Sequence, residues 1–245
     1  VKSGILQNVT NQTMRDIYGP QIELAKGLPN WFERVNRKVE SLGYQASHHV
    51  VSAGCTPFVE GTDIAPYLDS ICAGEYLDDI QGIKKIKKVV EPNNKTAEIR
   101  KICKGTGINQ DLPIDDYAIN YDHVILFGDG ESDKRMFNFI RERGGYAIGV
   151  YGKNNKPSLD KTKRDLKGRV NFILPRNYSI SSIIEDITMQ LIDKIKDRTC
   201  DFDYRMVHAL SLDHLRNDHL IDLTSKHLSG CDDCRQRNRE TLIFA

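Results

Sequence analysis

The stretch VILFGDGESDKRMF, Val124 to Phe137, constrains the fold of this chain more than any other. Its apolar start predicts a buried strand, a Gly-Asp-Gly run ends that strand abruptly, and the following residues predict a helix from about Ser132 to Arg143. A buried strand that leads directly into a helix is typical of an α/β protein with parallel strands. We therefore expect an α/β fold, a mostly parallel sheet with helices on its faces.

The segments around this stretch alternate in the same way. Helices are predicted over residues 29–43 and 94–105 and from Ser179 onward, strands at residues 50–51, 145–151 and 169–175, and a hairpin with its turn around residues 78–82. The order of these segments predicts parallel strands joined by helical crossovers. We expect residues 1–196 to form this α/β domain and residues 197–245 to form a small helical module.

Composition excludes several classes of function. The net charge of +1 gives no large positive field, so no nucleic-acid partner is predicted. No apolar run approaches the roughly 20 residues that cross a bilayer, and the first residues have no apolar core resembling a signal peptide. The six cysteines are too sparse for a disulfide framework. We expect a cytoplasmic protein without membrane contact.

Polar residues follow the predicted strands at the edge where such folds bind ligands. In an open parallel sheet, the crevice lies beyond the carboxyl ends of the strands, where Ser52, Asp129 and Asp133 are expected. Asp133 comes one helical turn after Asp129, so both carboxylates can face one point. Two oxygen donors there suit Mg²⁺, which keeps several waters and accepts a phosphate oxygen.

Three further features complete a phosphate site. Lys95, in the first turn of a predicted helix, can supply an ammonium group, and Ser52, with the backbone N–H groups of Ala53 and Gly54, can donate hydrogen bonds. Taken alone, Gly-Asp-Gly is a common turn, Lys95 a solvated helix residue and Ser52 a cap or turn residue. Their combined order favours a site for a small phosphorylated substrate.

The segments HHVVSAG, NNKTAEI and VILFGDGESD resemble, in this order, the second, third and fourth sequence motifs of the haloacid dehalogenase-like (HAD) hydrolases. The resemblance covers roughly residues 28–175. It implies a Rossmann-like core and a Mg²⁺-dependent phosphatase that transfers the phosphoryl group through an aspartyl-phosphate intermediate. By motif match, Ser52 and Lys95 would bind the phosphoryl group, Asp129 and Asp133 would hold Mg²⁺, and Gly128 and Gly130 would shape the loop. Residues 1–26 would then be the remnant of a small cap.

The first motif of that family, an apolar strand that ends in Asp-x-Asp, is missing. It supplies the nucleophile and the general acid/base. Asp201-Phe202-Asp203 has the spacing but follows a charged helix rather than an apolar strand, so we interpret it as unrelated. Three interpretations remain: a fragment, a family member that lost catalysis, or a piece completed by another chain. The lost strand would be central, so its absence should expose two neighbouring strands.

A second group of candidate ligands lies near the end of the chain. His227, Cys231 and Cys234 form a His-x3-Cys-x2-Cys arrangement, and Cys200 is the best fourth ligand, with His208, His214 and His219 as alternatives. The pattern with Cys200 resembles the zinc-binding module of anti-sigma factors, small helical proteins that bind a sigma factor. Incidental surface residues and a redox Cys-x-x-Cys are the competing interpretations.

Two functions follow from these patterns. The first is a HAD-like phosphohydrolase acting on a small phosphate ester, with Mg²⁺ in the core and a structural Zn²⁺ in the C-terminal module; this chain is expected to be inactive without the nucleophile motif. The second is a non-catalytic regulatory protein whose zinc module docks a protein partner such as a sigma factor.

Overall fold

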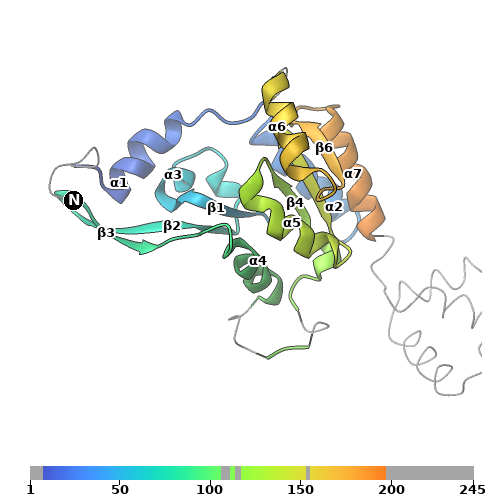
Figure 1. The fold of residues 1–245 in the computed structure, drawn as a ribbon, viewed down its shortest axis with the longest axis horizontal. Coiled ribbons are helices and arrows are strands. Elements are labelled where there is room, and N and C mark those ends of the chain that lie inside the picture. Colours follow the sequence, from blue (N-terminus) through green and yellow to red (C-terminus); the bar gives the residue numbers. More distant parts are fainter. Residues whose placement is uncertain (1–7, 106–110, 114–116, 153–154, 197–245) are drawn as a thin grey trace, which may run out of the picture. The chain divides into compact units, whose positions relative to one another are not determined.

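A computed structural model describes residues 8–105, 111–113, 117–152 and 155–196 (Figure 1). The chain divides into two compact units, Val1–Leu191 and Ile192–Ala245. The predicted zinc module lies outside the described residues, as do Asp201-Phe202-Asp203. The fold is therefore described for the first unit and for the last helix, which ends at Lys196.

The first sheet is fully parallel, as predicted, in the order β4-β5-β6. It consists of β4 (Ile125–Gly128), β5 (Tyr146–Tyr151) and β6 (Phe172–Pro175). Ile125 is in register with Tyr146, and Ile148 with Phe172. The central strand β5 is buried along nearly its whole length because it has a strand on each side and helices over both faces.

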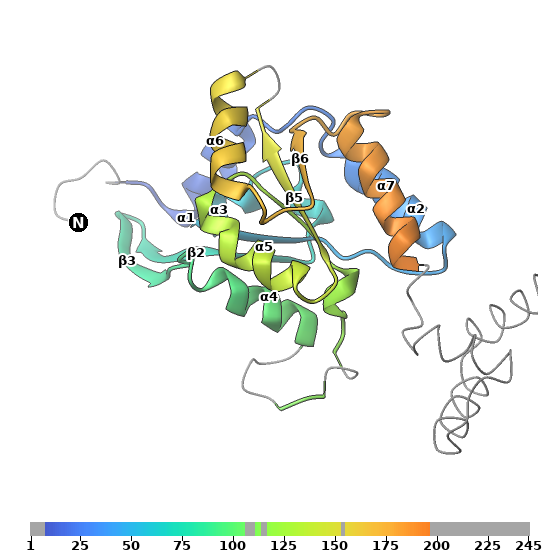
Figure 2. The same cartoon turned by 45° about the vertical axis from the view of Figure 1, so that its right-hand side comes forward.

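Helices from different parts of the sequence cover both faces of this sheet. Figure 2 shows α5 (Lys134–Arg141) and α6 (Lys156–Leu166) on one face, and α2 (Asn30–Ser41) and α7 (Ile183–Lys196) on the other. Trp31 of α2 packs edge-on against Phe127 of β4, with ring centroids 5.6 Å apart. Arg34 of α2 forms an ion pair with Glu185 of α7.

The second sheet is mixed, in the order β1-β2-β3. β1 (His49–Cys55) runs parallel to β2 (Ser70–Asp79), and β2 forms the predicted hairpin with β3 (Gly82–Lys88). The parallel connection from β1 to β2 passes through α3 (Thr56–Glu60). We expected one sheet; within the described residues the strands form two separate three-stranded sheets, with β1 and β4 each at an edge.

A single core connects the two sheets. Phe137 and Ile140 of α5, Leu166 of α6 and Ala147 of β5 are fully buried in one cluster with Ile99 and Cys103 of α4 (Lys95–Lys104). Val51 of β1, partly buried, packs against this cluster. The β1 strand is thus attached to the core of the other sheet through side chains and through α4.

Two helical regions were not expected from the sequence. One is α6, which provides the crossover that parallel strands β5 and β6 require. The other is a run of short turns before residue 22: α1 (Asn11–Thr13), a π-helical turn Met14–Tyr18 and a 3₁₀ turn Gly19–Gln21. These turns dock on the second sheet and α3, because Asn11 N donates to Asp78 Oδ2 at 2.6 Å and Arg15 pairs with Glu60 at 2.5 Å.

The remaining described elements are short 3₁₀ turns at Ala65–Tyr67, Tyr121–His123 and Glu131–Asp133. The last of these stands where the helix from Ser132 was predicted to begin. The α-helix itself begins at Lys134 and ends at Arg141.

Candidate functional site

The Gly-Asp-Gly loop connects the end of β4 to the start of α5. Asp133 N donates to Gly130 O at 3.1 Å, which closes the 3₁₀ turn between them. A Cβ atom at Gly128 would lie 2.4 Å from Asp133 Oδ2 and 2.8 Å from Phe137 Cζ. Only glycine therefore allows the Asp133 carboxylate to fold back against the end of the strand.

Lys95 and Asp133 form a buried ion pair at this loop. Lys95 Nζ lies 2.7 Å from Asp133 Oδ1, and only 7% and 8% of the two side chains are exposed. Lys95 Nζ also donates to Ser132 Oγ at 3.3 Å. The sequence prediction that Lys95 and Asp133 meet at one edge of the sheet is confirmed. Because both charges have lost most of their water, each depends on the other for its solvation.

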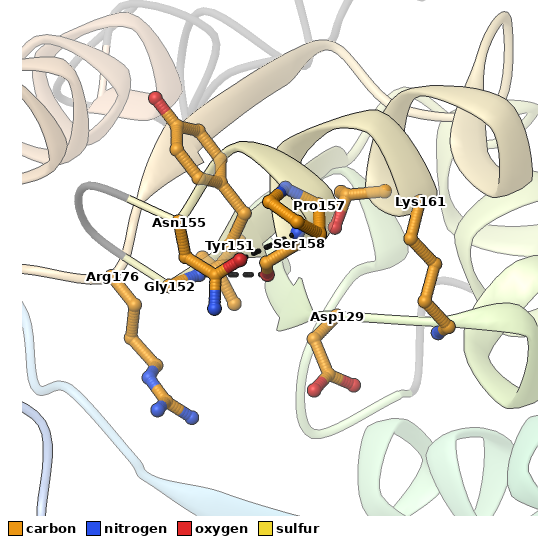
Figure 3. A pocket seen from close by; sticks show the side chains of 10 residues that line it. Asp129, Tyr151, Gly152, Asn155, Pro157, Ser158, Lys161 and Arg176 are labelled. Atoms are coloured by element: carbon orange, nitrogen blue, oxygen red, sulfur yellow. Dashed lines mark hydrogen bonds between the residues drawn. The ribbon is translucent and has the colours of Figure 1, made fainter.

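Asp129 lies differently from Asp133, on the wall of a cavity of about 440 Å³ (Figure 3). The cavity lies beyond the carboxyl ends of β4, β5 and β6, the edge at which ligands bind in open α/β sheets. Its lining residues are Asp129, Val150, Tyr151, Gly152, Asn155, Pro157, Ser158, Lys161, Thr162 and Arg176. Asp129 is the member of the predicted site that reaches this cavity.

Ser52, Ala53 and Gly54 were expected beyond the end of the strand but lie within β1, which continues to Cys55. Its pairing with β2 is irregular between Val51 and Cys55. Gly54 N donates to Ser52 Oγ at 2.9 Å, and Ala53 and Gly54 are exposed. The Ser52 hydroxyl thus stabilises a local turn, and its own O–H remains available as a donor. The helix that carries Lys95 packs against β1, which places both segments on one side of the core.

The two carboxylates differ in their fitness for a metal ion. Lys95 and Ser132 both contact Asp133 Oδ1, so Oδ2 remains turned toward Gly128. Asp129 contributes a second carboxylate on the cavity wall. No group of three or more His, Cys, Asp or Glu side chains suited to a metal ion is found in the described part of the chain. Mg²⁺ binding by Asp129 and Asp133 therefore stays a prediction.

The sequence analysis predicted only Asp129 among the cavity residues, and the polar residues that it missed include Asn155, Ser158, Lys161 and Arg176. Asn155 caps α6, since its side chain accepts a hydrogen bond from Ser158 N at 2.9 Å, and Pro157 stands in the first turn. An Asn followed two residues later by Pro is a helix-start signal that could have revealed α6. Arg176 directly follows the predicted strand that ends at Pro175. Because ligands bind beyond the carboxyl ends of parallel strands, Arg176 could have been expected at the site as well.

The proposed zinc ligands Cys200, His227, Cys231 and Cys234 lie outside the described residues, and the zinc site stays a prediction. In the described segments, no helix combines the length and the apolar character that a bilayer crossing requires.

Comparisons with known proteins add one relative. The chain is 23% identical to an uncharacterized protein of Borreliella burgdorferi, in an alignment that covers 78% of this chain and 74% of that protein. No protein-family model matches the chain. No solved structure gives a significant match. The relative indicates a shared ancestor, and its description assigns no activity.

Proposed function

We propose that the loop after β4, the start of α4 and the end of β1 form the Mg²⁺ and phosphate site of a HAD-like phosphohydrolase that acts on a small phosphate ester. The observation that carries this proposal is the buried Lys95–Asp133 pair at the carboxyl end of β4, next to Asp129 on a cavity wall. An ammonium group and two carboxylates at such an edge are the groups that phosphoryl transfer requires of a protein.

Each residue has a defined part in this proposal. Asp129 and the second oxygen of Asp133 would hold Mg²⁺, which when bound neutralises charge on the phosphate oxygens. Lys95 fixes the Asp133 carboxylate and would add a positive charge beside a bound phosphate. Ser52, with the N–H groups at the end of β1, would donate hydrogen bonds to the phosphate. None of these residues supplies a nucleophile.

The proposal predicts binding without turnover. The chain should not hydrolyse para-nitrophenyl phosphate, because no Asp-x-Asp follows an apolar strand in this sequence. Phosphate release that requires Mg²⁺ and disappears with Asp129→Ala would contradict that expectation.

Calorimetric titration with inorganic phosphate tests the site itself. We expect binding with added MgCl₂, much weaker binding without it, and loss of this difference in Asp129→Asn. Asp160→Asn, which removes an exposed carboxylate of α6 outside the cavity, is the matched control. Equal phosphate affinity with and without Mg²⁺ in the wild-type protein would overturn the proposal.

One observation favours the second function, a regulatory binding protein. Lys95 already neutralises Asp133 without a ligand, as expected of a site that has kept its structure but lost its chemistry. In that case the activity would reside in the C-terminal module and its protein partner. Metal analysis of protein purified without chelator should then find one Zn²⁺ per chain, and a chelator should unfold that module. Absence of zinc would remove this alternative.

A further inference from the structure

The side chains that line the cavity beside Asp129 carry more positive charge than the Asp129 carboxylate neutralises. Lys161 of α6 and Arg176 after β6 both line it. Within the described residues, the Arg176 side chain forms no ion pair, and the Lys161 ammonium has only Asp165, at 3.5 Å, as a partner. The Lys161 side chain is 59% exposed, so water weakens even that pair. Two cations are therefore available to a ligand.

The side chains of the cavity are arranged to meet one ligand. In Figure 3 the ends of Arg176, Asn155, Asp129 and Lys161 extend toward the same side. Lys161 Nζ would lie 3.7 Å from a Cβ atom at Gly130, so this ammonium group is directly next to the Gly-Asp-Gly loop. Arg176 enters from the end of another strand, β6. The two cations thus approach the cavity from separate elements.

The loop between β5 and α6 holds the polar wall of the cavity in place. Gly152 N donates to Ser158 Oγ at 3.0 Å, and Ser158 N donates to Asn155 Oδ1 at 2.9 Å. These bonds use the Asn155 carbonyl oxygen and leave its amide N–H groups as donors to a ligand. The volume of about 440 Å³ is within the range of small-ligand pockets and exceeds what a lone phosphate group fills.

We infer that this cavity binds a second anionic group, a carboxylate or a phosphate, on the small phosphate ester, held between Lys161 and Arg176. The inference rests on the proposed function, because it places the phosphoryl group and Mg²⁺ at Asp129. With Mg²⁺ bound, the positive charge of the ion, Lys95, Lys161 and Arg176 exceeds the negative charge of Asp129, Asp133 and one phosphate dianion. The planar guanidinium of Arg176 suits a carboxylate or phosphate, which it can bind through two parallel hydrogen bonds.

The test compares two probes of equal carbon chain length, 3-phosphoglycerate and glycerol 3-phosphate, by calorimetric titration of the full chain in MgCl₂. The probe with the carboxylate should bind about tenfold more tightly, the effect of one or two charge-assisted hydrogen bonds. Arg176→Gln and Lys161→Gln should each remove most of this preference. Lys163→Gln removes the same charge from an exposed position of α6 outside the cavity and should retain it.

The outcomes separate this inference from the function on which it rests. Equal affinities for the two probes, a preference unchanged in both variants, or no binding of either probe at millimolar concentration would overturn the inference. If 3-phosphoglycerate binds through Arg176 but needs neither Mg²⁺ nor Asp129, the anion pocket stands and the proposed phosphohydrolase site fails. Circular dichroism of each variant shows whether the fold is retained.

Discussion

The two sheets of this protein have similar apolar sequences but different degrees of burial. β5 is paired on both sides, and Ala147 and Ile148 are fully buried. β1 is paired on one side within the described residues, and none of its residues is buried. Val50 and Val51 would suit a buried strand as well as the residues of β5 do. β2 is also paired on both sides, yet only its Ala73 and Gly74 are buried. Helices over both faces of the sheet, in addition to strand pairing, therefore decide where the rigid core lies.

The candidate site lies where the rigid sheet ends. Asp129, Asp133 and Arg176 follow β4 and β6, which are anchored by β5, whereas Ser52 lies within the half-exposed β1. A site with one firmly held side and one less firmly held side should respond unequally to substitutions. The predictions below compare the two sheets, starting with the largest expected effect.

Removing an apolar side chain should lower stability far more in the core around the β4–β5–β6 sheet than in the β2–β3 hairpin. Phe137→Ala empties a fully buried position and should lower the free energy of unfolding by about 3–5 kcal/mol. Ile80→Ala, at the tip of the β2–β3 hairpin, where Ile80 is 96% exposed, should leave it unchanged. Urea unfolding measures both. Similar losses in the two variants would show that the hairpin is part of the core.

Ion pairs provide the second comparison. Lys95→Met leaves the buried Asp133 carboxylate without its partner and should destabilise the protein by about 3 kcal/mol. Lys84→Met breaks the exposed Lys84–Asp79 pair of the hairpin and should have no measurable effect. Equilibrium unfolding is again the measurement. The account of the loop fails if Lys95→Met is tolerated as well as Lys84→Met.

Glycines near the carboxyl ends of β4 and β1 provide the third comparison. Gly128→Ala brings a Cβ atom against Asp133 and Phe137 and should cost about 1–3 kcal/mol. Gly54→Ala meets only the Ser52 hydroxyl, at 3.2 Å, and should cost clearly less. Thermal unfolding measures the loss of stability in both variants. A larger loss for Gly54→Ala than for Gly128→Ala would mean that the backbone around Gly54 is more rigid than the loop after β4.

Protonation of His48 and His49, at the start of β1 in the second sheet, should destabilise the protein less than the destabilising substitutions above. Burial lowers the pKa of His48 and of His49 below 6.5, despite the opposing attraction of Asp69. The unfolded chain binds these protons more readily, so stability is fully present above pH 6.5 and is lost as the pH falls toward the folded-state values. The free energy of unfolding of the wild type should decrease between pH 7.5 and 5.5. The double variant His48→Gln/His49→Gln should show a smaller decrease, and an equal decrease would contradict this cause.

Local pattern was enough to predict the elements with a clear apolar period. The strand before Gly128, the helix from Lys95 and the strands over 145–151 and 169–175 are all present, as are helix 30–41 and the hairpin. The rule that carboxyl ends of parallel strands share an edge placed Asp133. Lys95, which begins a helix, was placed beside Asp133 by the order of the segments and by their resemblance to the HAD motifs.

The apolar pattern of the sequence did not predict elements that have few buried apolar side chains. In α6 only Thr162 and Leu166 are buried, so KPSLDKTKRDL shows too narrow an apolar stripe to mark a helix. The division into two sheets depends on long-range hydrogen bonds that no local period encodes. Lys161 reaches the cavity through α6, which was not predicted, whereas Arg176 follows a strand that was predicted and was overlooked.

The central claim is that Mg²⁺ binds at the loop between β4 and α5. Replacing Mg²⁺ with paramagnetic Mn²⁺ at substoichiometric concentration and recording amide NMR spectra locates the ion directly. We expect the amide signals of Gly128, Gly130 and Ser132 to broaden first and to recover when Mg²⁺ is added in excess. If these signals stay sharp while others vanish, the ion binds elsewhere and the account of this site is wrong.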